Sequence, residues 1–198
     1  MAAIRIAEGN RRLLDIALDR LTLGRAALYR AVLSGAVMEG SEGEKGMVTF
    51  SVVQKGTVPF SLRENWDCPL RENRDSPLAE ALQTARRELA AAVEGLRQAG
   101  TTHHLLRGLL SRAWLRGLEG DAAGARADLE EAWQTAERGG MRLFLVDVLL
   151  YRARLSCAGP DRPAALADLA AARKLIDQCG YHRRTPELAD AEAALGAL

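Results

Sequence analysis

The second half of the chain repeats itself with a period of 40 residues. Residues 109–140 and 149–180 are identical at twelve of 32 aligned positions. A further step of 40 upstream extends the pattern to a third copy, at Ala85, Leu89, Ala92 and Gly100. Because one such unit cannot bury its own apolar face, a chain of this kind folds as an array in which each copy packs on the next.

Each copy has the pattern of two helices joined by a tight turn. Apolar residues recur at spacings of three and four on either side of Gly120-Asp121. Glycine allows the first helix to end, and the aspartate side chain can cap the second one. Small residues such as Ala113 and Ala125 let the helix axes approach closely. With 48% hydrophobic but only 5% aromatic residues, the composition also favours an all-α protein.

The positions of Ala113, Gly120-Asp121, Ala125, Leu129 and Ala132 resemble the tetratricopeptide repeat signature. The unit of 40 residues is longer than the usual ~34, and in this it is similar to the degenerate arrays at the C-terminal ends of bacterial multidomain signalling ATPases. The resemblance implies a right-handed solenoid of about three helical hairpins, formed by residues 1–36 and 78–198.

Both ends of the predicted array have distinctive features. Near the N-terminus, Arg25-Ala26 matches Arg112-Ala113 and marks the first helix of the first hairpin, and Ala3–Gly9 has the pattern of a tail left from a preceding repeat. At the C-terminus, Pro186–Leu198 is expected to form a helix that closes the stack, with Thr185 as its N-cap.

Residues 37–77 interrupt the first hairpin at its inter-helix turn. This segment is rich in Gly and Pro and contains the tandem octapeptides LRENWDCP (62–69) and LRENRDSP (70–77). Three interpretations remain open: a binding loop on a rigid scaffold, a small β-hairpin, or a recently acquired repetitive element. The tandem repeat favours the third, and we expect the insert to be mostly disordered.

Sequence motifs of catalysis are missing. The chain has no glycine-rich phosphate-binding loop, no Gly-x-Ser-x-Gly elbow and no His-Glu-x-x-His. The adjacent His103 and His104 point about 100° apart on a helix, so they cannot share an ion as an i, i+4 pair would. The sequence therefore predicts a protein that is not an enzyme, with no cofactor and no metal.

The charges of the chain are nearly balanced, with 27 Lys and Arg against 26 Asp and Glu. This balance argues against binding to nucleic acid or to an anionic membrane. The acidic run at 128–131 and the basic run at 182–184 are expected to be solvated, with pairing across neighbouring helices as the alternative. No stretch approaches the length of a membrane-spanning helix. Three cysteines without ligand spacing indicate a reducing cytoplasm.

The resemblance also implies a concave groove lined by the first helix of each hairpin. Carried over residue by residue, it places there Arg20, Arg30, Arg107, Leu110, Trp114, Asp147, Leu150 and Arg154. A tryptophan among arginines is typical of a binding hot spot, although Trp114 fits a plain core position equally well. Leucine stands at the positions of the family's carboxylate-clamp lysines, which argues against chaperone-tail binding.

The predicted function is that of a protein-interaction module. It would bind a peptide or helical segment of another protein in this groove, as an adaptor or as the sensor arm of a signalling system. Two alternatives remain. The chain could self-associate weakly through the N-terminal end of the stack, because an uncapped end exposes apolar area. It could also be a fragment of a larger multidomain protein with no function of its own.

Overall fold

The computed structural model describes residues 2–39, 77–157 and 162–196, and every regular element in these ranges is helical. The α-helices are α1 (Ala2–Glu39), α2 (Pro77–Gln98), α3 (Thr102–Leu118), α4 (Ala122–Arg138), α5 (Arg142–Cys157), α6 (Arg162–Cys179) and α7 (Thr185–Gly196), and a short 3₁₀ turn, η2 (His182–Arg184), precedes α7. The predicted all-α class is therefore confirmed. The octapeptides, and the expectation of disorder in the insert, lie outside the described residues.

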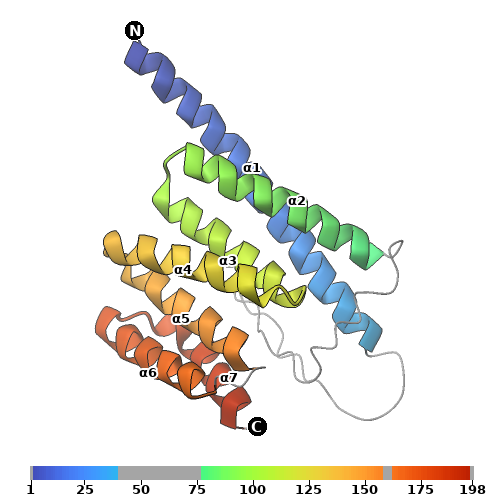
Figure 1. Cartoon of the computed structure of the whole chain (residues 1–198), viewed down its shortest axis with the longest axis vertical. Helices are drawn as coiled ribbons and strands as arrows, with labels where there is room; N and C mark the ends of the chain where they lie inside the picture. The colour runs from blue at the N-terminus through green and yellow to red at the C-terminus, as the bar shows by residue number, and fades with distance from the viewer. Residues whose placement is uncertain (1, 40–76, 158–161, 197–198) are drawn as a thin grey trace. The chain divides into compact units, whose positions relative to one another are not determined.

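The described residues form two compact units. The first contains α1, α2, α3 and α4 up to Thr135, and the second begins at Ala136 and contains α5, α6, η2 and α7. Within the first unit α1 runs antiparallel to α2 over the whole length of α2, and α3 turns back beneath them (Figure 1). Within the second, α5 and α6 pack side by side, and α7 contacts both.

A seam of small residues holds α1 against α2. The buried side of α1 is made by Ala17, Leu21, Gly24, Leu28 and Ala31, whose spacings of three and four place them on one face. The approach is closest at Gly24, where a Cβ atom would lie 2.8 Å from Leu89 Cγ. Glycine at this position therefore allows the two helix axes to come close together.

Two expectations about the N-terminal region are wrong. Ala26, aligned above with the buried Ala113, is exposed, since the packing face of α1 is set by the Gly24 seam. Residues 3–9 are not a separate tail, because α1 is one helix of 38 residues that runs through Gly9. A single glycine weakens a helix by only about 1 kcal/mol and does not end it.

The turns follow the repeat. Gly100, Gly140 and Gly180, spaced by 40 residues, all have left-handed φ angles between +62° and +68°. After each one, the next amide donates to a carbonyl five residues back, as in Met141 N to Ala136 O at 2.8 Å. At the predicted turn Gly120 has φ +78°, and Asp121 Oδ1 accepts a bond from Gly124 N at 2.8 Å, so the capping role of Asp121 is confirmed.

The C-terminal helix forms where it was expected, but it begins differently. Thr185 has helical angles of φ −58° and ψ −41°, so it lies inside the helical segment and is not an N-cap. The turn η2 leads directly into α7, which buries Leu188, Ala191 and Leu195. Within its unit α7 contacts both α5 and α6.

Candidate binding groove

A groove of about 380 Å³ lies between α1 and α3 in the first unit and is open to solvent on one side. It is lined by Leu18, Leu21, Thr22, Arg25, Ala26, Tyr29, His104 and Arg107. Six of these residues come from successive turns of α1, and two come from the first turns of α3. The lining is therefore a mixture of aliphatic, aromatic and basic side chains.

The wall on the α1 side is organised around Tyr29. Its hydroxyl oxygen accepts a hydrogen bond from Arg25 Nη2 at 3.0 Å, and the Arg25 guanidinium lies 5.8 Å from the centre of the Tyr29 ring. Behind it, Tyr29 contacts the Trp114 ring of α3, with the ring centres 5.5 Å apart. Because Trp114 is buried, it supports the aromatic wall of the groove from within.

The α3 side of the groove is basic. Arg107 is exposed at its edge, and His104 stands one helical turn before it. Partial burial lowers the pKa of His104, and the positive charges of His103 and Arg107 lower it further. His104 is therefore neutral at physiological pH, and the two arginines supply the charge of the groove.

The structure places the predicted site residues of the first unit in four different situations. Arg107 lines the groove. Leu110 and Trp114 are buried in α3. Arg20 instead pairs with Glu88 of α2 at 3.1 Å, and Arg30 is exposed outside the groove.

Of the lining residues, the sequence analysis placed only Arg107 in the groove; Arg25, Tyr29 and His104 are among those that it did not place there. Arg25 and Tyr29 were missed because the helical phase of α1 was taken from Ala26. The seam of small residues from Ala17 to Ala31 is the signal that could have set this phase correctly.

In the second unit, the chain's own C-terminal segment contacts the predicted site residues of α5. Arg184 Nε donates to Asp147 Oδ1 at 2.7 Å, and Arg184 Nη1 bonds Glu187 Oε1 at 2.6 Å. Arg154 Nη2 donates to the Glu187 carbonyl at 3.3 Å. Leu150 is buried. Asp147, Arg154, Arg184 and Glu187 thus form one charge cluster that joins α5 to η2 and α7.

Burial dominates the electrostatics of this cluster. It raises the pKa of Asp147, although the Arg184 guanidinium offsets part of the effect. Burial likewise lowers the pKa of Arg154. Burial also acts to lower the pKa of Arg184, but the carboxylates of Asp147 and Glu187 outweigh this effect, so the pKa of Arg184 is raised. The ion pairs of this cluster are shielded from water. Removing one partner therefore costs free energy of folding, because the other charge stays buried without a partner.

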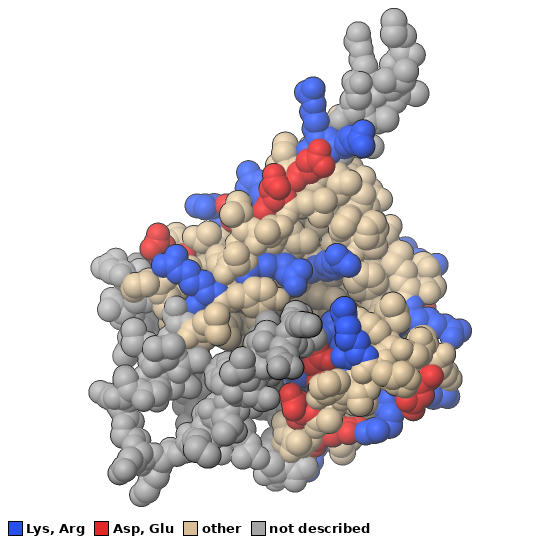
Figure 2. Space-filling model, turned by 180° about the vertical axis from the view of Figure 1, so that it is seen from behind, with Lys and Arg blue, Asp and Glu red and all other residues tan. Residues whose placement is uncertain are grey.

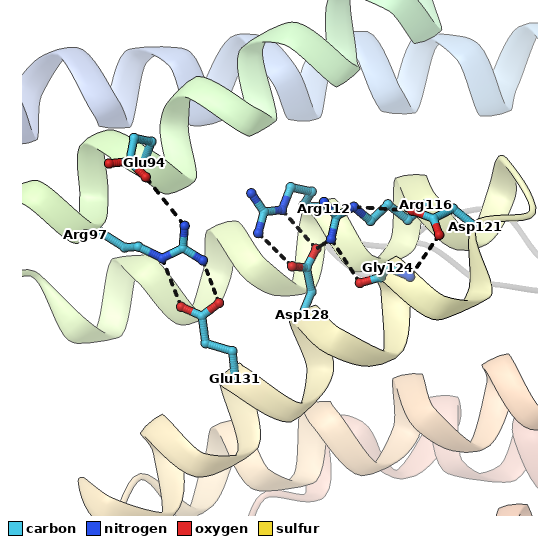
Figure 3. Close-up of polar contacts among 8 residues, drawn as sticks. All are labelled: Glu94, Arg97, Arg112, Arg116, Asp121, Gly124, Asp128 and Glu131. Carbon is cyan, nitrogen blue, oxygen red and sulfur yellow. Dashed lines mark hydrogen bonds and ion pairs between the residues drawn. The ribbon is translucent and has the colours of Figure 1, made fainter.

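The acidic run at 128–131 is only partly solvated. Asp128 is buried on α4, accepts two hydrogen bonds from Arg112, at 2.9 and 2.6 Å, and forms an ion pair with Arg116 (Figure 3). Glu131 pairs with Arg97 of α2. Forty residues further along the chain, Arg152 donates hydrogen bonds to Asp168 through the equivalent nitrogens, Nε and Nη2. For Asp128, Glu131 and Arg184 the expectation of a solvated face is therefore wrong and the pairing alternative holds. Glu130, His182 and Arg183 are exposed, as expected.

On the face shown in Figure 2, some Lys and Arg side chains form a row, and elsewhere basic and acidic side chains are interspersed. Within the described ranges, no group of three His, Cys, Asp or Glu side chains is arranged to hold a metal ion. None of the helices there combines the length and apolar character needed to cross a bilayer.

Comparison of the chain with protein-family models, with curated proteins and with solved structures found no match.

Proposed function

We propose that this chain is a cytoplasmic protein-interaction module that binds a segment of a partner protein in the α1–α3 groove. In this proposal it acts as an adaptor or as the sensor arm of a signalling system, and it catalyses no reaction. The observation that carries the proposal is the lining of the groove, where an apolar and aromatic wall stands beside two arginines. Aromatic and arginine side chains are the types in which binding energy concentrates.

The size of the groove agrees with this role. A volume of about 380 Å³ is at the lower end for sites that enclose whole small molecules, whereas an open groove of that size can take a few side chains of a longer segment. Helix-in-groove recognition uses successive side chains of the ligand in this way.

The finer architecture belongs to the same proposal. We infer a right-handed, tetratricopeptide-like solenoid of about three repeats. It is supported by the left-handed glycines at 100, 140 and 180 and by the Arg–Asp bridges at 112–128 and 152–168, which keep the period of 40.

Site-specific photo-crosslinking in cell lysate tests the proposal. A photoreactive amino acid is placed at Ala26, which lines the groove, and in a control at Gln83, which is exposed on α2 outside it. We expect one partner protein to crosslink at position 26 and to be lost when Arg107→Glu is added. Equal labelling from both positions, or none from position 26, would contradict the proposal.

A second candidate function is self-association. Of the six large apolar side chains exposed among the described residues, four lie on α1: Leu13, Ile16, Leu23 and Leu33. Ile16 and Leu23 are 55% and 58% exposed and, seven residues apart, lie on one face of the helix. A second copy of the chain could cover this face, which is distinct from the groove.

A further inference from the structure

We propose that the α1–α3 groove selects partner segments that present carboxylates next to an apolar side chain. The inference rests on the proposed function and adds the chemistry of the partner. It is drawn from how the arginines of the first unit are paired, which distinguishes the two that line the groove from those that hold the helices together.

Arginines that join the helices of this unit are neutralised by carboxylates. Pairs with nitrogen–oxygen distances of 2.5 to 3.1 Å link α1 to α2, α2 to the turn after α3, α2 to α4, and α3 to α4: Arg20–Glu88, Arg86–Glu119, Arg97–Glu131 and Arg112–Asp128. The unit therefore uses ion pairs to fasten its own elements, and each pair leaves little charge for an outside ligand.

The arginines of the groove are different. Within the part of the chain that the structure describes, Arg25 donates to the neutral Tyr29 hydroxyl, and no carboxylate pairs with Arg25 or Arg107. Among the described residues, no Asp or Glu lines the groove either. Other arginines such as Arg30 and Arg126 are also exposed, but they do not line this concavity.

The position of the two guanidiniums strengthens their effect on a ligand. They stand on two different helices around one concavity, and a concave site with apolar walls concentrates the field of the charges that line it. Each guanidinium can bind a carboxylate through two parallel hydrogen bonds. Burial lowers the pKa of His104, and of the two groove arginines Arg107 lowers it further.

The rest of the lining accepts an uncharged side chain. Leu18, Leu21, Ala26 and the ring of Tyr29 provide apolar surface between the arginines. A segment with Asp or Glu on either side of a leucine or an aromatic residue would satisfy both parts of the groove at once. A basic segment would bring like charges together, which costs free energy without any compensating pair.

Selection from a display library of short random peptides tests this inference. The immobilised targets are the wild-type chain, the Arg25→Ala/Arg107→Ala variant and an Arg126→Ala control on α4. We expect Asp and Glu to be enriched on the wild type and on the control, and this enrichment to be lost on the double variant. Circular dichroism establishes that the three proteins are equally folded.

An enriched peptide and its Glu→Gln, Asp→Asn counterpart are then compared by fluorescence anisotropy. We expect the acidic form to bind the wild type about tenfold more tightly, and the difference to shrink in high salt. Enriched peptides with no acidic bias, or equal affinity of the two forms, would overturn the charge selectivity and leave the binding function standing. No enrichment on any target would overturn the binding function itself.

Discussion

Arg112 and Asp128 show how much one ion pair of this chain depends on its surroundings. The Asp128 side chain is only 3% exposed, and it accepts hydrogen bonds from Nε and Nη2 of Arg112. Arg112→Ala leaves this buried carboxylate with Arg116 alone, so we expect the free energy of unfolding to fall by about 3 kcal/mol. Chemical denaturation followed by circular dichroism measures this loss.

Arg173→Ala is the matched control for that substitution. Arg173 also bonds a carboxylate with its guanidinium, but its side chain is 57% exposed, and that of its partner Glu192 is 35% exposed. Because solvent screens an exposed pair, we expect Arg173→Ala to lose clearly less stability than Arg112→Ala. Equal losses in the two variants would show that the burial of Asp128 has no energetic consequence.

Gly24 tests the close approach of α1 and α2. Alanine at this position would bring Cβ within 2.8 Å of Leu89 Cγ and 3.0 Å of the Leu89 backbone nitrogen, so the helices must separate. We expect Gly24→Ala to lower the free energy of unfolding by about 2 kcal/mol, despite the better helix propensity of alanine. Gly9→Ala, with nothing within 4 Å, should leave stability unchanged or raise it slightly. A destabilised Gly9→Ala variant or a neutral Gly24→Ala variant would contradict this packing.

At the residue scale, the sequence predicts turns better than it predicts burial. Gly120 and Asp121 could be assigned in advance because their chemistry acts locally, on the helix ends beside them. The burial of Asp128 could not be assigned in advance, because an aspartate at this position fits a solvated face or a buried ion pair equally well. Which of the two forms depends on the packing of α3, which carries Arg112, against α4. Arg25 and Tyr29 were missed for a related reason, because their place in the groove depends on how α1 is rotated against α2.

At the scale of elements, α7 is attached to its unit through charges as well as apolar contacts. A helix of 12 residues is marginal by itself, so it depends on its docking contacts. Arg184→Ala leaves the buried carboxylates of Asp147 and Glu187 without their shared partner. We expect backbone amides of 188–195 to exchange hydrogen at least about tenfold faster, as measured by mass spectrometry.

Arg183→Ala provides the comparison for α7. This neighbour is exposed, and its guanidinium lies 5.8 Å from the Tyr181 ring centre. Its loss should leave exchange in α7 at the wild-type rate. If both variants behave alike, the charge cluster does not hold α7 in place.

The same cluster predicts a pH dependence. Because burial raises the pKa of Asp147, the carboxyl group of this residue binds its proton more tightly in the folded chain than in the unfolded chain. The stability contributed by Asp147 is thus greatest below its ordinary pKa of 3.8 and falls as the pH rises through the raised value. Asp147→Asn removes this titration, so the stability of the wild type relative to the variant should decline across that window. Denaturant titrations of both proteins at a series of acidic pH values measure the difference, and parallel curves would contradict the prediction.

Helices as elements could be predicted from the sequence, but their ends could be predicted only in part. The boundary at Pro77 and the closing helix follow from proline and the hydrophobic pattern, which act locally. The continuity of α1 through Gly9 does not, because a glycine ends a helix only where the surrounding structure favours a left-handed turn, as it does at Gly100 and not at Gly9. The helical conformation of Thr185 could not be predicted either, because it depends on the direct continuation of η2 into α7.

At the scale of the whole molecule, the period of 40 was the most reliable feature of the sequence. It is repeated in backbone angles at Gly100, Gly140 and Gly180 and in the paired bridges of Arg112 and Arg152. The first hairpin departs from it, since the insert breaks the register between its two helices. The helical phase that the repeat implied for α1 therefore placed Arg20 and Arg30 in the predicted groove, whereas Leu18, Arg25 and Tyr29 line the concavity beside α3.

Self-association is the prediction that belongs to the chain as a whole. With Ile16 and Leu23 exposed on α1, we expect the average mass measured by static light scattering to rise with concentration. Leu23→Arg should abolish the rise, because it places a charge in the contact. Leu166→Arg, at a residue of α6 that is 48% exposed, should not. A mass of 21.4 kDa at every concentration would remove this contact from consideration. Since Leu23 does not line the groove, the Leu23→Arg variant should still bind the acidic peptide, and the two surfaces of α1 can be tested independently of each other.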